Sequence, residues 1–343
     1  MSRQRSGLYL ADSRGCPDEV AIIGIGQTAV GEHWDMSLRE IAGEAVIAAL
    51  NDAGRERVDG IFVGNMMSGI LCHQENLGTL IADWVGLRGV EAFKVEAACG
   101  AGAAAVHLGI MAIASGYMDC AIAMGVEKMS ETPMSETTSA LATASDADYE
   151  GDIGVSFVSL NALIMQRYMH EYGWKHSDFA PFSINAHNNA MHNPYARLRE
   201  KITQDAYSKA RMICDPISLL DASPTGDGAA VVVLVPLDSL KPDGLPLVKI
   251  AGSAAATDSI AIHNRWDPLW LFAAHESVRK AYAQAGIGPS DVDLFELHDA
   301  FSIMSALSLE ACGFAERGQG PRLGLEGEIL LGGRIPVTTC GGL

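Results

Sequence analysis

Basic side chains are scarce in this sequence. It has 24 Lys and Arg against 42 Asp and Glu, which gives a formal net charge of −18 at pH 7. Sequence-independent binding of nucleic acid needs clustered Lys and Arg, and an anionic membrane surface attracts the same groups. The charge balance therefore argues against both of these partners and favours a protein that stays in solution.

Long apolar runs and targeting signals are missing as well. No hydrophobic stretch approaches the roughly 20 residues of a membrane-spanning helix. Residues 1–6 lack the apolar segment that is typical of a secretory signal. From these two absences we predict a soluble, cytoplasmic protein.

Cysteine is sparse and shows no pairing pattern. The seven cysteines are scattered, and no two of them form a Cys-x-x-Cys pair: Cys16, Cys72, Cys99, Cys120, Cys214, Cys312 and Cys340. An odd number without such pairs indicates neither a disulfide framework nor a zinc site. We therefore expect free thiols in a reducing cytosol and no bound metal.

Apolar runs bounded by glycine are plentiful, and they determine the predicted fold class. With 343 residues, of which 48% are hydrophobic, the chain exceeds the usual size of one domain. Residues 1–18 are polar and are predicted to form a leader. Beyond them, buried strands alternate with amphipathic helices, which is typical of an α/β sheet with right-handed crossovers. The predicted strands are 20–26, 58–64, 93–98, 120–125 and 228–236, and the predicted helices between them include 38–53 and 77–85.

A long excursion interrupts this alternation. From residue 130 to about residue 220 the sequence is rich in Met, His, Asn, Tyr and Ser, with helical patches at 160–172 and 183–192 and no strong strand. We predict an insertion that lies over the sheet. Because ordering so long a segment costs conformational entropy, such an insertion is more often functional than idle.

Two stretches of the sequence echo each other. Near residue 53 and again near residue 285, an Ala-Gly pair closes a helical pattern and a Val-Asp pair opens an apolar run. Alignment of the two aspartates places His298 opposite Gly64, at the end of a predicted strand at 292–297. Open α/β sheets bind their ligands at the carboxyl ends of strands. The echo therefore indicates a duplicated fold with two similar halves.

The stretch 95–109 holds the first candidate for chemistry. An apolar run stops on Cys99, and a helix of glycine and alanine begins. The N–H groups and macrodipole of a helix N-terminus favour a thiolate, so we expect a lowered pKa and a nucleophilic sulfur at Cys99. The small side chains would let this helix lie close against neighbouring layers. The alternative is an inert buried thiol, because free cysteine is among the most buried residue types.

His298 is the second candidate. Together with Asp299 it stands where the predicted strand 292–297 ends, before a predicted helix at 302–310. A neutral imidazole at this position can donate a hydrogen bond to a carbonyl oxygen or order a water molecule. The alternative is a histidine with a structural role only.

Other polar residues in and after the insertion lack the spacing of metal ligands. The histidines fit exposed or hydrogen-bonding positions, and the aspartates fit turns and caps. These residues are His170, His187, His192, Asp215, Asp221 and Asp227.

Short motifs occur along the chain in a fixed order, from about residue 19 to the last residue. They are the apolar run 20–26, Gly31-Glu-His-Trp-Asp35, Val63-Gly-Asn-Met66, Val95-Glu-Ala-Ala-Cys99, Gly125-Val-Glu-Lys-Met129, His170-Glu-Tyr-Gly173, Asn193-Pro-Tyr-Ala196, Ser223-Pro-Thr-Gly-Asp-Gly-Ala-Ala230 and Leu297-His-Asp-Ala-Phe301. In composition and spacing they resemble the thiolase superfamily. Within that superfamily, the archaeal acetyl-CoA acetyltransferases and the sterol-carrier-type thiolases are the most similar branches.

The resemblance implies a fold. It is the α/β thiolase fold, with five layers in the order α/β/α/β/α, two similar halves and a loop domain. Residues 19–129 and 221–240 would form the N-terminal half, residues 130–220 the loop domain that covers coenzyme A, and residues 241–343 an incomplete C-terminal half.

The resemblance also implies a chemistry and partners. Cys99 would take an acyl group from a thioester, and His298 would help to polarise the thioester oxygen, with Asp299, Gly341 and Gly342 in supporting positions. The substrate would be a coenzyme A thioester, with no permanently bound cofactor. Relatives form homodimers or homotetramers. The archaeal branch can also associate with 3-hydroxy-3-methylglutaryl-CoA (HMG-CoA) synthase and with a small zinc-ribbon/OB-fold protein of the DUF35 type.

Three positions depart from the pattern of that family. The nucleophile motif reads Cys99-Gly-Ala-Gly102 where relatives have Cys-Ala-Ser-Gly. Ala300 replaces the cysteine that acts as acid and base toward the acyl acceptor in sterol-carrier-type enzymes, and alanine cannot move a proton. The sequence stops at 338–343, where relatives continue into a Gly-His-Pro motif whose histidine deprotonates the nucleophile. This last departure predicts a truncated product or a fragment.

The leading functional hypothesis is a CoA-dependent acyltransferase that works through a cysteine acyl-enzyme, as acetyl-CoA C-acetyltransferases and 3-ketoacyl-CoA thiolases do. One alternative is a non-catalytic or scaffold subunit that binds acyl-CoA or lipid, which Ala300 favours. Another is a thiolase-like retro-aldolase that acts with an OB-fold partner.

Overall fold

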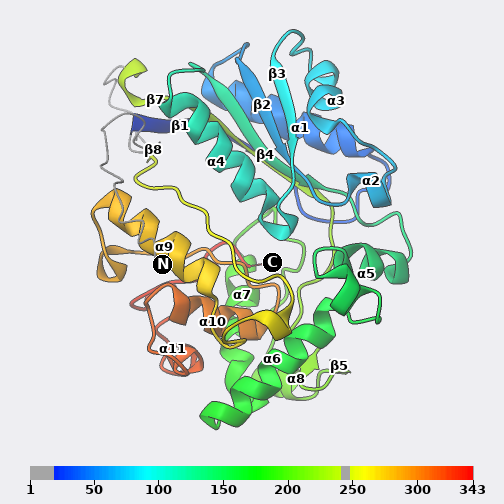
Figure 1. Cartoon of the computed structure of the whole chain (residues 1–343), viewed down its shortest axis with the longest axis vertical. Helices are drawn as coiled ribbons and strands as arrows, with labels where there is room; N and C mark the ends of the chain where they lie inside the picture. The colour runs from blue at the N-terminus through cyan, green and yellow to red at the C-terminus, as the bar shows by residue number, and fades with distance from the viewer. Residues whose placement is uncertain (1–18, 241–247, 343) are drawn as a thin grey trace, which may run out of the picture.

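The computed structural model describes residues 19–240 and 248–342 (Figure 1). The predicted leader at 1–18, which contains Cys16, lies outside the described residues. The helices and strands are β1 (Val20–Gln27), α1 (Leu38–Ala53), β2 (Gly60–Gly64), α2 (Ser68–Leu71), α3 (Leu77–Trp84), β3 (Glu91–Val95), α4 (Ala101–Ala114), β4 (Ala121–Glu127), α5 (Met134–Ala142), α6 (Phe157–Tyr172), α7 (Ala180–Ala190), α8 (Gln204–Ser208), β5 (Met212–Cys214), β6 (Ile217–Ser218), β7 (Gly228–Pro236), β8 (Val248–Lys249), α9 (Phe272–Ala285), α10 (Ser302–Ala311) and α11 (Gly320–Leu325).

A mixed six-stranded sheet forms the upper part of the molecule in Figure 1, with the strand order β3-β2-β4-β7-β1-β8. β2 pairs in parallel with β3 and with β4. β7 pairs antiparallel with β4 and β1, and β8 adds an antiparallel edge beside β1. The α/β class is thereby confirmed, and all five strands predicted up to residue 236 are present, although β3 spans 91–95 and not the predicted 93–98.

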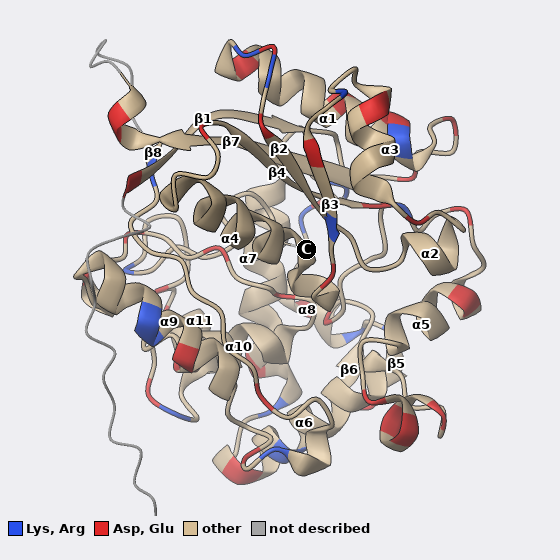
Figure 2. Ribbon diagram, turned by 45° about the horizontal axis from the view of Figure 1, so that its top comes forward, with Lys and Arg blue, Asp and Glu red and all other residues tan. Residues whose placement is uncertain are grey.

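Helices cover both faces of this sheet. Ile61 and Val63 of β2 belong to a core shared with α1 and α3, whereas Phe62 between them belongs to a second core shared with α4. In Figure 1, α4 lies in front of the sheet, with α1 and α3 behind it. α4 contains no Lys, Arg, Asp or Glu and is tan throughout in Figure 2. Strands that are buried on both faces need no polar alternation, which explains their continuous apolar runs.

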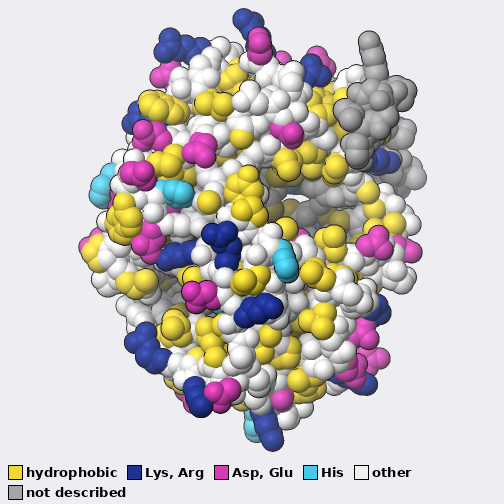
Figure 3. All heavy atoms as spheres, turned by 180° about the vertical axis from the view of Figure 1, so that it is seen from behind, with side chains coloured by type: hydrophobic (Ala, Val, Ile, Leu, Met, Phe, Trp, Pro, Cys, Tyr) yellow, Lys and Arg dark blue, Asp and Glu magenta, His cyan; other side chains and the backbone are white. Residues whose placement is uncertain are grey.

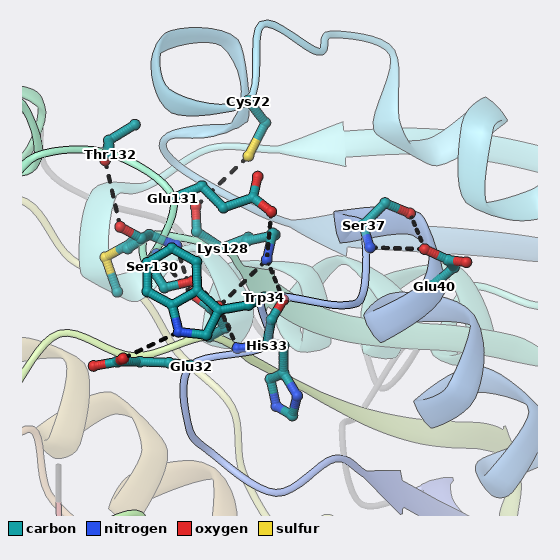
Figure 4. Close-up of polar contacts among 12 residues, drawn as sticks. Glu32, His33, Trp34, Ser37, Glu40, Cys72, Lys128, Ser130, Glu131 and Thr132 are labelled. Carbon is teal, nitrogen blue, oxygen red and sulfur yellow. Dashed lines mark hydrogen bonds and ion pairs between the residues drawn. The ribbon is translucent and has the colours of Figure 1, made fainter.

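α1 begins and ends where the sequence predicts. The carboxylate of Glu40 accepts hydrogen bonds from the backbone N–H and the hydroxyl of Ser37, at 2.7 and 2.6 Å (Figure 4). These bonds satisfy donors at the helix start. At the other end Gly54 adopts a left-handed conformation with φ +60°, and α9 ends in the same way at Gly286, with φ +69°. The helical part of the sequence echo is therefore confirmed.

The insertion at 130–220 forms α5 to α8 and the short β5–β6 pair, and it makes up much of the lower part of Figure 1. Its main apolar cluster joins Met165 and Tyr168 of α6 with Ile303 and Leu307 of α10. That cluster includes no residue of the six-stranded sheet. The insertion therefore packs mainly against the helices of the C-terminal half, whereas its helix α5 packs against Met67 and Leu71, just after β2.

The C-terminal half departs from the echo in its strand. The predicted strand 292–297 is extended, but within the described residues it makes only one isolated parallel bridge, between Phe295 and Val337. The N–H of Phe295 donates to the carbonyl oxygen of Pro336 at 2.8 Å. A strand needs a continuous ladder of partners, and 292–297 has one such contact. The second sheet of the expected five layers is therefore not formed in the described part of the chain.

None of the helices that the structure describes is long and apolar enough to cross a membrane.

Candidate active site

Cys99 sits in a tight turn between β3 and α4. Residues Ala98–Gly100 form a single 3-10 turn, and Ala98 has φ +48°, a left-handed conformation that is uncommon for a residue with a side chain. The carboxylate of Glu96 accepts a hydrogen bond from the N–H of Ala98 at 2.6 Å and holds the turn. The side chain of Cys99 is exposed. Cys99 is therefore not a buried core cysteine.

Small residues let the first turn of α4 lie directly on the sheet. A Cβ atom on Gly64, the last residue of β2, would overlap the backbone of Ala101. Gly102 of α4 faces Gly125 of β4, and a Cβ on Gly125 would come within 3.4 Å of the Cα of Gly102. The predicted close approach of the glycine and alanine helix is thereby confirmed. It places Cys99 at the carboxyl edge of the parallel strands β2, β3 and β4.

The pKa of the Cys99 thiol is raised, which is opposite to the expectation from the helix N-terminus. The largest cause is partial burial of the sulfur, which disfavours the thiolate. The backbone N–H of Cys99 acts in the other direction, and the nearby charge of Glu127 adds to the increase. The helix terminus is therefore outweighed by burial and by one carboxylate.

Glu127, which sequence reasoning did not single out, ends β4 beside this edge. Its Oε1 accepts hydrogen bonds from the N–H groups of Met66 and Met67 at 2.5 and 3.3 Å. Its Oε2 is buried and has no hydrogen-bond partner among the described residues. Burial raises the pKa of this carboxyl group. Its position in the sequence could have identified it, because a glutamate at the carboxyl end of a buried parallel strand lies at the edge where such sheets bind ligands.

His298 lies in the extended segment that follows Phe295, and its side chain is exposed. Its imidazole makes no hydrogen bond with the described residues. Partial removal of the ring from water lowers the pKa of His298, so the ring is neutral at pH 7. Two residues before it, the carboxylate of Glu296 accepts a hydrogen bond from the N–H of Thr339 at 2.8 Å. The segment that carries His298 is thus held beside the end of the described chain.

Gly341 and Gly342 occupy positions that only glycine adopts readily. Their φ angles are +118° and +71°, in the left-handed region. A Cβ on Gly341 would overlap Ala190 of α7, and a Cβ on Gly342 would overlap the carboxylate of Asp299. The structure therefore brings three of the predicted supporting residues, Asp299, Gly341 and Gly342, into direct proximity.

Three asparagines on and just after α7 hold the last described segment. The side-chain amide groups of Asn185, Asn189 and Asn193 donate to backbone carbonyl oxygens of Val337, Thr338 and Cys340, at 3.0, 2.9 and 2.9 Å in that order. Residues four apart lie on the same face of a helix, so the insertion grips this segment at regular intervals. In Figures 1 and 2, the C-terminal end of the chain lies beside the start of α4. The Cys99 turn and the segment of His298 therefore meet in one region.

Asp221, which the sequence assigns to a turn or cap, is the centre of a buried network. Its side chain has no exposed surface. Its Oδ1 accepts hydrogen bonds from the hydroxyl groups of Tyr207 and Ser302, and its Oδ2 accepts from His176 Nε2 and from Ser218. Burial alone would raise the pKa of Asp221, but these hydrogen bonds together hold it below its usual range.

Asp227 is a second fully buried aspartate, and it joins the two ends of the insertion. Its carboxylate accepts hydrogen bonds from the backbone N–H groups of His33, Met129 and Ser130 at 3.0, 2.7 and 2.9 Å. Residues 129 and 130 open the insertion, and Asp227 directly precedes β7, where the chain returns to the sheet. This role goes beyond the predicted turn, and it depends on a contact across 97 residues that local patterns do not show.

Lys128 is buried and is paired with the buried Asp227; Figure 4 shows Lys128 between His33 and Glu131. Its ammonium group donates to the carbonyl oxygen of His33 at 2.6 Å and lies 3.5 Å from Asp227 Oδ2 and 3.3 Å from Glu131 Oε1. The thiol of Cys72 contacts the carbonyl oxygen of Lys128 at 3.6 Å. The described residues contain no group of three or more His, Cys, Asp or Glu side chains placed to bind a metal ion, so this cluster is an ion-pair network.

Basic side chains are locally concentrated on one face in spite of the negative net charge. Figure 3, which views the molecule from behind, shows Lys and Arg side chains near the middle of the face, beside a histidine and hydrophobic side chains. Such a surface offers positive charge together with apolar contact area.

Comparison with known proteins gives a consistent result. Residues 20–238 match the family model of the thiolase N-terminal domain, and residues 254–343 match the thiolase C-terminal domain-like model. An acetyl-CoA acetyltransferase of Methanothermobacter thermautotrophicus is 43% identical over 95% of this chain and 85% of that protein. The benzoylsuccinyl-CoA thiolase subunit BbsB of Thauera aromatica is 31% identical over 95% of this chain and 83% of that protein.

Solved structures are similar over most of the chain. The Ltp2-ChsH2(DUF35) aldolase superposes with a TM-score of 0.83 and 27% identity, covering 96% of this chain and 85% of that one. An acetyl-CoA acetyltransferase from Syntrophomonas wolfei gives a TM-score of 0.66 at 18% identity, covering 86% and 82%. The second match supports the fold alone.

Proposed function

This chain belongs to the thiolase family, and we propose that it works as a thiolase-type acyltransferase through an acyl-enzyme formed on Cys99. The named relatives support the activity, since two acetyl-CoA acetyltransferases are 43% and 37% identical to this chain. One observation supports the site. Cys99 presents an exposed thiol on a tight turn at the carboxyl edge of parallel strands, where α/β sheets bind ligands.

The proposed reaction has two steps. In the first, the Cys99 sulfur attacks the carbonyl carbon of a coenzyme A thioester, the bond from that carbon to the coenzyme A sulfur breaks, and coenzyme A leaves with the proton that Cys99 releases. In the second, a carbon nucleophile or coenzyme A takes the acyl group and restores the thiol. Condensation and cleavage are the two directions of this reaction. The thioester is the substrate, and the proposal needs no permanently bound cofactor.

We assign His298 the role of hydrogen-bond donor to the thioester oxygen. A neutral imidazole donates one hydrogen bond without adding a competing positive charge, and the lowered pKa of His298 keeps it neutral at pH 7. Oxygen of the attacked carbonyl gains negative charge in the transition state, so a fixed donor there lowers the barrier. Asp299, Gly341 and Gly342 support the segment that carries His298.

We propose that residues 130–220 act as a loop domain that covers coenzyme A, between an N-terminal half at 19–129 and 221–240 and a C-terminal half at 241–343. Through α7 the insertion binds Thr338, next to Thr339, which is bonded to Glu296 in the segment of His298. The insertion begins shortly after Glu127, whose charge acts on Cys99. Coenzyme A carries phosphates, and the basic side chains in the middle of the face in Figure 3 offer the charge that phosphates need.

A homodimer, or a tetramer of two such dimers, is the proposed assembly. β3 pairs with β2 on one side, and its other edge is unpaired in the described residues. Phe93 in the middle of β3 is 50% exposed. An open edge strand with an exposed aromatic side chain favours pairing with a second copy. Phe93→Lys would then shift the sedimentation coefficient to that of a monomer, whereas Ile153→Lys, at an exposed residue of the insertion, would not.

A retro-aldolase is the second candidate, and the match to the Ltp2-ChsH2(DUF35) aldolase favours it. Ala300 has no proton to transfer, and its backbone oxygen is already bonded to the N–H of Ser223 at 3.0 Å. In that reaction a 3-hydroxyacyl thioester would lose its hydroxyl proton, its Cα–Cβ bond would break, and the α-carbon would take up a proton. A DUF35-type protein would be the partner of this activity.

The remaining partner and location proposals rest on weaker support. Association with an HMG-CoA synthase follows from the resemblance to archaeal relatives, and co-purification would test it. A cytoplasmic location agrees with six described cysteines that are all free thiols.

The experiment that tests the acyl-enzyme is intact-mass analysis before and after incubation with acetyl-CoA. The parent protein should gain one acetyl group. Cys99→Ala should lose this gain, and Cys340→Ala, which removes the other exposed thiol among the described cysteines, should keep it. Absence of the adduct from the parent, together with cleavage of a 3-hydroxyacyl thioester in the presence of a DUF35-type protein, would favour the retro-aldolase instead.

A further inference from the structure

The hydrogen-bond network around Asp221 contacts the chain just after His298. The backbone N–H of Ser302 donates to the carbonyl oxygen of Asp221 at 2.9 Å, and the N–H of Ser223 donates to the carbonyl oxygen of Ala300 at 3.0 Å. Between these bonds, Ala222 and Phe301 form an antiparallel bridge. Residues 221–223 therefore hold residues 300–302, which begin two positions after His298.

The side chain of Asp221 strengthens the same contact. The hydroxyl of Ser302 donates to Asp221 Oδ1 at 2.5 Å, so Ser302 is bound through both its backbone and its side chain. The hydroxyl of Tyr207 on α8 donates to the same oxygen. His176 Nε2 lies 2.7 Å from Oδ2, and its ring stacks on Tyr207 with centroids 4.8 Å apart. One buried carboxylate thus connects the insertion to the first residue of α10.

Such a network is stable only when it is complete. A buried carboxylate that loses one of its donors keeps its desolvation cost without the compensating bond. The segment therefore has one favourable position rather than a range of positions. His298 makes no hydrogen bond of its own with the described residues, so its place depends on the backbone on either side. Glu296 and Thr339 fix the preceding side, and Asp221 and Ser302 fix the following side.

We propose that Asp221 is a positioning residue for His298, which it places through the buried hydrogen bonds to Ser302, Tyr207 and His176. This inference rests on the proposed role of His298 in acyl transfer. The network sets the distance between the imidazole and the thioester oxygen, and it contacts no part of the substrate. Its loss therefore slows the chemical step and leaves substrate binding nearly unchanged.

The test uses single changes that remove one donor from Asp221. Ser302→Ala removes one hydroxyl, and Ser305→Ala is the matched control, because Ser305 is also buried on α10 and makes no bond to Asp221. His176→Gln is paired with His170→Gln, an exposed histidine of α6. Tyr207→Phe removes only a hydroxyl and replaces Ser302→Ala if that variant does not fold. Each protein is compared with the parent by circular dichroism and thermal melting.

Two readouts separate positioning from general damage. Ser302→Ala and His176→Gln should lower kcat for acyl transfer by about tenfold with KM changed by less than roughly twofold, and both controls should match the parent. In parallel, NMR follows the ring carbon–hydrogen signal of His298, which is assigned by its loss in His298→Gln. In the variants the pKa of His298 should rise by about half a unit toward its ordinary value, because a looser segment exposes the ring to water.

The outcomes distinguish this inference from the proposed function. An unchanged His298 signal in Ser302→Ala and Tyr207→Phe would overturn the positioning role, and so would equal effects of Ser302→Ala and Ser305→Ala on kcat. A parent protein that shows no acyl transfer, together with a His298 signal that moves in the variants but not in the controls, would support the positioning role and reject acyl transfer as the reaction.

Discussion

Burial is the main cause of the raised pKa of the Cys99 thiol, and the carboxylate of Glu127 adds to it, although the two residues belong to different strand ends and lie 28 positions apart in the sequence. Glu127 ends β4, Cys99 lies in the turn just beyond β3, and parallel pairing through β2 brings both strand ends to the same edge. A negative charge disfavours a second negative charge nearby. The protonated thiol of Cys99 is therefore favoured over the thiolate, and the sulfur has to lose its proton before it can attack.

Glu127→Gln removes that charge, so the pKa of Cys99 should fall toward its ordinary value. The rate of Cys99 alkylation by iodoacetamide, measured between pH 6 and pH 10, should then rise at lower pH than in the parent. Glu131→Gln is the control, because Glu131 is an exposed carboxylate that does not perturb Cys99. A profile that moves to higher pH in Glu127→Gln would contradict the electrostatic assignment.

Asp227→Asn should destabilise the fold, because it leaves the buried ammonium of Lys128 without its fully buried counter-ion. We expect a loss of about 3 kcal/mol in the free energy of unfolding by urea. Asp35→Asn, at an exposed aspartate, should be close to neutral. If both variants unfold at the same urea concentration as the parent, the bonds of the Asp227 carboxylate contribute no measurable stability.

The same residue predicts an acid transition. Burial alone would raise the pKa of Asp227, but hydrogen bonds from Ser130, His33 and Met129 hold it below 3.8 in the folded protein. A folded pKa below the unfolded value gives stability that is complete above about pH 3.8 and is lost as the pH falls through the folded value. Urea unfolding at pH 3, 4 and 6 should show this loss in the parent and a smaller one in Asp227→Asn.

Glu310 should affect the pH dependence of stability in the opposite direction to Asp227. Burial raises the pKa of this carboxyl group above 4.5, in spite of the hydrogen bond from Tyr168, and its Oε2 has no partner among the described residues. Its ionised form therefore costs stability as the pH rises through the folded pKa. Glu310→Gln should gain about 1 kcal/mol on the parent between pH 4 and pH 7 in urea unfolding. Glu316→Gln, at an exposed position, should show no such dependence on pH.

Gly342→Ala should disturb the site more than the fold. An alanine at φ +71° is strained, and its Cβ would overlap the carboxylate of Asp299. We expect a stability loss of about 1–2 kcal/mol and a larger proportional loss in the rate of Cys99 acylation. Gly332→Ala is the matched control, because that glycine has open space around it and no left-handed φ. Equal acylation rates in both variants would show that Gly342 does not contribute to the active site.

Local periodicity was sufficient to predict the N-terminal half. β1, β7 and α1 lie where apolar runs and the Ser37–Glu40 pair indicate, because these elements are defined by residues close in sequence and are buried on one or two faces. The turn at Cys99 was likewise predictable, since the apolar run and the small-residue helix meet there. These local patterns do not show which distant part of the chain each element packs against.

The missed features all depend on such distant neighbours. The strand at 292–297 was predicted from its apolar residues, yet a strand forms only where a partner backbone lies alongside it, and here one bridge to Val337 is present. The raised pKa of Cys99 follows from burial and from Glu127, neither of which a helix N-terminus shows. Asp221 and Asp227 gain their roles largely from donors far away in the chain, so the local sequence predicted only turns and caps.

Asn185, Asn189 and Asn193, on and just after α7, hold residues 337–340 mainly through backbone carbonyl oxygens, and Asn185 also reaches the hydroxyl of Thr338 at 3.4 Å. Every amino acid carries a backbone carbonyl oxygen, so the bonds to these oxygens do not depend on which residues occupy the segment. The bonds to carbonyl oxygens therefore constrain the spacing of the three amides more than the identity of the residues that they hold. The insertion of a single residue into α7 would shift the three amides relative to one another. It would therefore disturb residues 337–340 more than most substitutions within those residues.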